Sequence, residues 1–146
     1  MTGKVIELFI TQNSDKKTRL SVESIQVDAD GIIGDKFYAK DPMRAILLSS
    51  QHSYTLSKDN SIPLETGALG ENILIDINPY SLLHGDRLKI GDTLLEITQN
   101  CTLCKGLSSL NSKLPKLLKN DRGIFVKLIN GSSEIKLGDK VEILNY

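Results

Sequence analysis

Short apolar runs separated by turn residues are the feature that most constrains how this chain can fold. Valine, isoleucine and leucine gather in segments of strand length, and Gly-Asp pairs stand between several of them. Glycine reaches positive φ without a steric cost and aspartate can bond its own backbone, so these pairs predict tight turns. The pattern predicts strands at Lys4–Ile10, Ser21–Val27, Ala45–Ser49, Ile73–Ile77, Arg87–Ile90, Thr93–Thr98, Gly123–Ile129 and Lys140–Leu144.

Many short strands with closely spaced turns favour a closed or partly closed β-barrel, because closure leaves no exposed sheet edge. Helical spacing is confined to the leucines from Leu103 to Leu118, which recur every three or four residues. Pro115 interrupts this pattern, so we expect two short helices, the second beginning near Ser112–Lys113 with Pro115 in its first turn. A further short helix is expected at Gln51–Leu56. The predicted fold is therefore mostly β, with a few short helices.

Composition limits the classes of protein that fit. The 146 residues suit one domain, 1–146, because single cores usually hold roughly 100–200 residues. Eighteen Lys and Arg balance eighteen Asp and Glu, and this zero net charge argues against a nucleic-acid-binding protein. No apolar run approaches the roughly 18–20 residues that cross a bilayer, and the first residues lack the pattern of a secretory signal. We therefore expect a cytoplasmic protein with neither nucleic-acid nor membrane partners.

The sharpest chemical feature is the pair Cys101 and Cys104, which follows a predicted strand. No zinc site is expected, because four ligands are needed and His52 and His84 lack the paired spacing of a zinc finger. A thioredoxin-like dithiol would require a βαβ setting that the pattern does not show. A third interpretation is a nucleophilic or metal-ligating thiolate at Cys104, where the adjacent Lys105 would lower the thiol pKa. Two small buried hydrophobic residues remain an equal alternative.

Other candidates lie at the ends of predicted strands. Gly70, Glu71 and Asn72 precede an apolar strand, where glycine permits close backbone approach and the two polar side chains offer acceptors and donors. Arg44 and Arg122 each precede an apolar run, and arginine can hold phosphate or carboxylate through two hydrogen bonds. From the residues alone, an ordinary capped loop and two solvated arginines explain these features as well.

In this order the motifs resemble the MOSC domain, the C-terminal module of molybdenum cofactor sulfurases, here as a stand-alone small member. The resemblance is carried by Gly31–Asp35, Arg44, Gly70-Glu71-Asn72, Leu82–Leu88, Leu95–Gln99, Cys104, Arg122-Gly123 and Gly138-Asp139. It implies a β-rich, pyruvate-kinase-barrel-like fold with the cysteine near a cleft. One departure is that many members carry histidine where this chain has Phe37, after Lys36.

The resemblance also implies functions. Cys104 takes the place of the family's characteristic cysteine, and Cys101 receives no firm role. Around the site, Arg44, Glu71, Asn72 and Arg122 match expected positions, and Gly70 and Lys105 complete the predicted cofactor-binding set.

Three functions follow as expectations. The first is a sulfur carrier with a persulfide on Cys104, loaded by a cysteine desulfurase and unloaded to a molybdoenzyme or a cofactor-biosynthesis acceptor. The second is a molybdenum-cofactor-dependent reductase of N-hydroxylated compounds, with Cys104 as a metal ligand. The third is a non-catalytic adaptor barrel. Pyridoxal phosphate binding is implied only at the level of the family.

Overall fold

The computed structural model describes residues 2–12, 19–101 and 105–144, without the side chains of 105 and 106. The strands are β1 (Thr2–Thr11), β2 (Arg19–Val22), β3 (Ser24–Asp28), β4 (Gly31–Ile32), β5 (Ile46–Ser50), β6 (Ile73–Ile75), β7 (Arg87–Ile90), β8 (Thr93–Asn100), β9 (Ile124–Leu128), β10 (Ser132–Lys136) and β11 (Lys140–Leu144). The helices are α1 (Gln51–Asp59), α2 (Lys105–Leu110) and α3 (Leu114–Leu117). These elements confirm the mostly β class with short helices.

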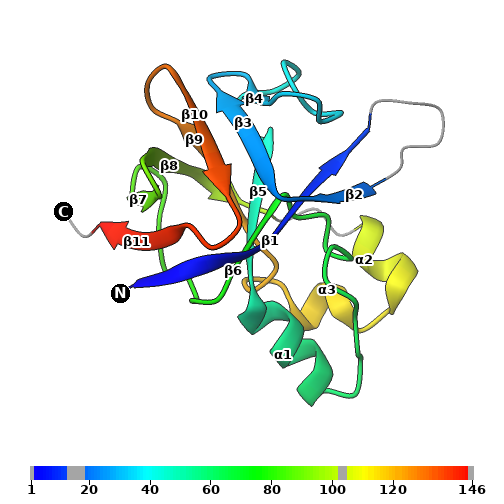
Figure 1. Cartoon of the computed structure of the whole chain (residues 1–146). Helices are drawn as coiled ribbons and strands as arrows, with labels where there is room; N and C mark the ends of the chain where they lie inside the picture. Colours follow the sequence, from blue (N-terminus) through cyan, green and yellow to red (C-terminus); the bar gives the residue numbers. More distant parts are fainter. Residues whose placement is uncertain (1, 13–18, 102–104, 145–146) are drawn as a thin grey trace.

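Seven strands close into a barrel in the order β1-β11-β7-β8-β9-β5-β6, and β6 returns to β1 (Figure 1). The pairs around the ring are antiparallel except for β5 with β6, which run parallel. Strand β2 extends the sheet from β1, and β10, β3 and β4 form a second small sheet. The predicted barrel is therefore confirmed, and each of the seven strands in its closed ring pairs on both sides.

Because side chains alternate in direction along each strand, one strand contributes residues both to the barrel core and to its outer surface. In β5, Ile46 and Leu48 belong to the main core, whereas Leu47 between them packs in a separate small cluster with Cys101 and Phe125. Successive side chains of a strand point to opposite faces, so one strand serves both the core and the outside of the barrel. The same alternation in β9 buries Ile124 in the core.

The helices lie together on one side of the barrel (Figure 1). Helix α1 begins at the N-cap Ser50, whose Oγ accepts a hydrogen bond of 3.0 Å from the His52 amide, and it runs past the predicted end. Helix α3 carries Pro115 in its first turn, as predicted, because that position needs no intrahelical donor. Within the described residues, none of the helices has the length and apolar character needed to span a membrane.

Two predictions about strands were incomplete. The segment Ser21–Val27 forms two strands rather than one, since β2 pairs with β1 and β3 pairs with β10. Strand β10 was not predicted, because Ile135 is its one buried residue and the others are polar or charged. One buried position in five residues gives little alternation to detect, and the partner strand β3 lies far away in the sequence.

Candidate functional site

A pocket of about 640 Å³ lies on the outer face of the barrel, over the pair β5 and β9. Leu47 and Phe125 are directly opposite each other in this pair and line the pocket from the barrel side. Leu69 and Cys101 also line it. The floor is therefore apolar, and it is built from the outward-facing residues of two strands whose other residues fill the core.

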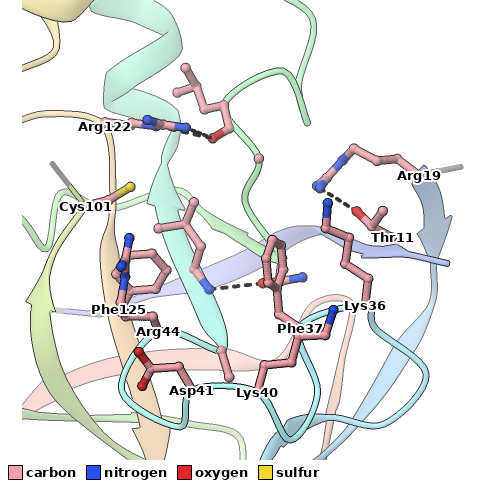
Figure 2. Close-up of a pocket in the computed structure, with 15 residues that line it drawn as sticks. Thr11, Arg19, Lys36, Phe37, Lys40, Asp41, Arg44, Cys101, Arg122 and Phe125 are labelled. Atoms are coloured by element: carbon pink, nitrogen blue, oxygen red, sulfur yellow. Dashed lines mark hydrogen bonds between the residues drawn. The ribbon is translucent and has the colours of Figure 1, made fainter. Parts of the chain in front are cut away.

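Cationic side chains surround this floor: Arg19, Lys36, Lys40, Arg44 and Arg122. Among the described residues of the lining, the one acid is Asp41. Figure 2 shows Arg44 and Arg122 on one side of the pocket and Arg19 and Lys36 on the other. Several like charges that converge on one concave site create a positive potential, which favours an anionic ligand.

The two arginines predicted from the sequence reach the pocket from opposite ends of the Leu47–Phe125 pair. Arg44 precedes β5 and Arg122 precedes β9, and these strands are antiparallel. The Arg44 guanidinium lies 5.7 Å from the centre of the Phe125 ring. Arg122 Nη2 donates a hydrogen bond of 3.2 Å to the Leu69 carbonyl oxygen. Each guanidinium is thus oriented by a contact within the protein while it lines the pocket.

Gly70 and Asn72 also line the pocket, and their hydrogen bonds lie within the protein. The Gly70 amide donates to the Gly67 carbonyl at 3.1 Å. Asn72 Oδ1 accepts from the Leu47 amide at 3.0 Å, and Asn72 Nδ2 donates to the Phe9 carbonyl at 3.2 Å. Asn72 therefore joins β5 to β1 and fixes the shape of the pocket wall.

Glu71 is fully buried and does not line the pocket. Its Oε2 accepts hydrogen bonds from the Tyr54 hydroxyl at 2.5 Å and the Gly67 amide at 3.2 Å, whereas Oε1 has no hydrogen-bond partner among the described residues. Burial raises the pKa of Glu71, although the hydrogen bond from Tyr54 acts in the opposite direction. Burial likewise raises the pKa of Tyr54, which keeps its hydroxyl a donor. The structure thus places Glu71 outside the pocket lining, in contact with Tyr54 and Gly67, and its cofactor role stays a prediction.

Three of the pocket cations were not predicted as site residues. Arg19 of β2 donates to the Thr11 hydroxyl at 3.1 Å and to the Glu71 carbonyl, and its guanidinium lies 5.3 Å from the Phe9 ring centre. Lys36 and Lys40 come from the segment that follows β4. Arg19 is separated from the two lysines in the sequence, and contacts of β1 with β2 and with the segment around Asp35 bring them to one pocket.

Of the two cysteines, Cys101 lies within the described residues. Cys101 is 5% exposed and lines the pocket beside Leu47 and Phe125. Figure 2 shows its sulfur directed into the pocket. Cys104 lies outside the described residues, as does the side chain of Lys105, the first residue of α2.

The remaining possible metal ligands are dispersed. His52 lies with its Nε2 at 3.3 Å from Asp121 Oδ1, away from the pocket lining, and His84 is exposed. Within the part of the chain that the structure describes, no three His, Cys, Asp or Glu side chains gather as a metal site would require.

A known sequence family and several solved structures resemble this chain. A family model for the MOSC domain matches residues 35–142. YuaD from Bacillus subtilis has a similar structure, with 21% identity and a TM-score of 0.82 over 100% of this chain and 97% of that chain. YiiM from Escherichia coli has 17% identity and a TM-score of 0.73 over 100% of this chain and 71% of that chain.

YiiM from Geobacillus stearothermophilus has 15% identity and a TM-score of 0.72 over 98% of this chain and 75% of that chain. At these identities the likeness to solved structures shows the fold. No curated protein matches the sequence of this chain.

Proposed function

Because the chain belongs to the MOSC domain family, as its motifs predicted, we propose that it binds a phosphorylated ligand of the molybdenum-cofactor type in the pocket. The observation that carries this proposal is the lining, in which five cationic side chains of the described residues surround an apolar floor. An apolar floor suits an organic ring, and arginine and lysine suit a phosphate group. A cavity of about 640 Å³ falls in the range of small-molecule sites.

The residues present fit such a ligand in defined ways. Arg44 and Arg122 would hold the phosphate from the two ends of the floor, and Arg19, Lys36 and Lys40 would add to the positive potential. Cys101 places a soft sulfur donor at the wall, and Cys104 follows three residues later as the proposed metal ligand. When bound, the cofactor would supply redox chemistry at its molybdenum, including reduction of N-hydroxylated compounds.

Sulfur transfer is the second candidate, and the thiol of Cys101 beside a cationic pocket favours it. Nearby cations stabilise a thiolate or persulfide anion. In this proposal the Cys104 thiolate attacks the outer sulfur of a persulfide on a cysteine desulfurase, and the donor leaves as a thiolate. A nucleophile of a molybdoenzyme or of the cofactor-biosynthesis machinery then takes the outer sulfur and releases the Cys104 thiolate.

Native mass spectrometry of protein purified from a molybdenum-replete host tests both candidates. A molybdopterin-sized adduct that is lost in Arg44→Gln/Arg122→Gln supports cofactor binding, and such protein is then assayed with N-hydroxylated compounds. One added sulfur atom that is lost in Cys104→Ser, but kept in the arginine variant, supports the carrier. Cys101→Ser in parallel identifies which thiol is modified. If the wild type carries neither addition, and gains neither from free cofactor or a cysteine desulfurase, both candidates are wrong and the adaptor interpretation gains weight.

A further inference from the structure

Phe37 is an exposed aromatic side chain in the lining of the pocket. It is 46% exposed, whereas Phe125 on the pocket floor is 8% exposed. Figure 2 shows the Phe37 ring across the pocket from Phe125 and Arg44. A large apolar ring held in water at the mouth of a binding pocket costs free energy that a contact with a ligand would recover.

The backbone that carries Phe37 is firmly held. The carboxylate of Asp35, which is itself buried, accepts a hydrogen bond from the Phe37 amide at 3.2 Å through Oδ2. Its other oxygen, Oδ1, accepts from the Thr11 amide at 2.8 Å. The Lys36 amide donates to the Thr11 carbonyl at 2.8 Å, so Thr11 of β1 anchors the segment through both Asp35 and Lys36. An exposed ring on an anchored backbone is preorganised for contact, because little backbone freedom remains to be lost on binding.

The surroundings of the ring indicate the chemistry of its ligand. Lys36 Nζ lies 4.8 Å from the centre of the Phe37 ring, and Lys40 lines the pocket a few residues later. An aromatic face beside ammonium groups suits a ligand that has both a π-face and a negative charge. On the opposite side, the Arg44 guanidinium lies over Phe125, so the positive charge continues across the pocket.

We propose that Phe37 is the stacking platform for the planar heteroaromatic ring of a ligand whose phosphate or carboxylate is held by the pocket cations. The proposal rests on the proposed function for the anion and adds the class of ring-bearing ligand and the residue that selects it. A phosphorylated pterin belongs to this class, and so does a purine nucleotide. Phe37 then determines specificity, whereas Arg44 and Arg122 supply charge.

The absence of tryptophan from the sequence offers a direct readout. Phe37→Trp introduces a single indole at the platform while it keeps an aromatic face. Three probes separate ring from charge: pterin-6-carboxylate has both, pterin has the ring alone and inorganic phosphate has the charge alone. We expect saturable quenching of indole fluorescence by pterin-6-carboxylate, weaker quenching by pterin and none by phosphate.

Calorimetric titration of the intact protein measures the contribution of the ring. Phe37→Leu should weaken binding of pterin-6-carboxylate by about tenfold, since stacking on one aromatic side chain is commonly of that size. Phe37→Tyr should keep binding within about twofold, because it keeps the π-face. Phosphate binding should be the same in all three proteins. Leu83→Ala is the matched control, because Leu83 is 71% exposed and does not line the pocket.

The results test the anion site and the stacking platform separately. If Arg44→Gln/Arg122→Gln abolishes binding while Phe37→Leu binds pterin-6-carboxylate as tightly as wild type, the platform is wrong and the anion site stands. If wild type binds none of the three probes, the anion site and the platform both fail. Circular dichroism of each variant verifies that the barrel is folded.

Discussion

Arg44 and Arg122 flank the cross-strand pair Leu47–Phe125 and both line the pocket, so replacing either removes a positive charge from the site. A hydrogen bond to a charged group contributes about 1.5–3 kcal/mol, so Arg44→Gln and Arg122→Gln should each weaken phosphate binding by roughly tenfold or more. Isothermal titration at low and high salt measures this loss, and salt should weaken the wild type as well.

Lys119→Gln is a suitable control for the arginine variants, because Lys119 is exposed and outside the lining. Its affinity for phosphate should equal that of the wild type. If both arginine variants also bind phosphate as the wild type does, the pocket is not an anion site.

The buried carboxyl group of Glu71 should make the stability of the fold depend on pH. Burial holds its pKa above the value of about 4.3 that a glutamate has in an unfolded chain. Between these two pKa values the unfolded chain has released the proton and the folded chain still holds it, so stability falls as the pH rises. Glu71→Gln cannot titrate. The wild type should therefore lose stability relative to Glu71→Gln as the pH rises from about 4 through the folded pKa, and the difference should then level off.

Urea unfolding of both proteins across this pH range measures that difference. Glu65→Gln is the matched variant, because Glu65 is exposed in the same connection between α1 and β6. Parallel curves for wild type and Glu71→Gln would contradict the prediction.

Single residues also show what the sequence could and could not predict about the site. Arg44 and Arg122 were predictable, because each directly precedes an apolar strand. Arg19 and Lys36 were not, since their place in the pocket depends on contacts of β1 with β2 and with the segment around Asp35. Asn72 was correctly expected at a strand entrance, but only the structure shows that its amide is bonded within the protein.

At the scale of elements, Tyr80 ties three parts of the chain together. Its hydroxyl accepts from the Ser50 amide at 2.7 Å, lies 2.6 Å from Ser53 Oγ and donates to the Arg122 carbonyl at 3.2 Å. Burial raises the pKa of Tyr80 to about 12, so the hydroxyl stays protonated at neutral pH. Tyr80→Phe leaves these groups without their shared partner, and we expect unfolding free energy to fall by about 1–3 kcal/mol.

Denaturant unfolding measures this loss, and Tyr38→Phe serves as its control. The Tyr38 hydroxyl donates to Asp28 Oδ2 at 2.5 Å near the surface, where such a bond contributes less. Because Tyr80 holds the backbone of Arg122, phosphate affinity should fall with Tyr80→Phe and not with Tyr38→Phe. Equal stability of the two variants would show that Tyr80 does not join these elements.

Elements with strong local patterns were predictable. Arg87–Ile90 and Lys140–Leu144 were predicted with the bounds that the structure has, because apolar and polar residues alternate between clear turns. Strand β4 has two residues, Gly31 and Ile32, too few for any pattern. Asn-Gly is a common turn pair and occurs at Asn130-Gly131, but β10 beyond it pairs with β3 rather than turning back on β9, and turn chemistry does not encode that choice.

At the scale of the whole molecule, closure of the barrel depends on contacts between the two ends of the chain. Strand β1 pairs with β11 through Thr2 to Lys4 and then with β6 and β2 along its remaining length. No local pattern specifies which strand meets which, so the sequence predicts a barrel from its turns without predicting this seam. Strand β1 also holds β2 and the segment around Asp35, so the place of β1 in the closed barrel carries both to the pocket.

Gly3 lies in this seam opposite Val141, where little room is left for a side chain. A Cβ at Gly3 would lie 2.6 Å from Ile77 Cγ2 and would contact the Asp76 carboxylate, which accepts the Lys4 amide at 2.8 Å. Gly3→Ala should therefore cost about 1–3 kcal/mol through overpacking. Amide exchange should become faster in both β1 and β11, because loss of the seam exposes both strands together.

Thr2→Ala is the matched change, since Thr2 is an exposed neighbour in the same seam and such substitutions are usually within about 0.5 kcal/mol. Hydrogen exchange and urea unfolding of both variants measure whether Gly3→Ala loosens the pairing of β1 with β11. Faster exchange confined to β1 would mean that β11 stays ordered without its partner. Unchanged exchange in Gly3→Ala would mean that Ile77 and Asp76 adapt at no cost. Faster exchange in both strands, with phosphate affinity reduced in parallel, is the result expected if one closed barrel supports the pocket.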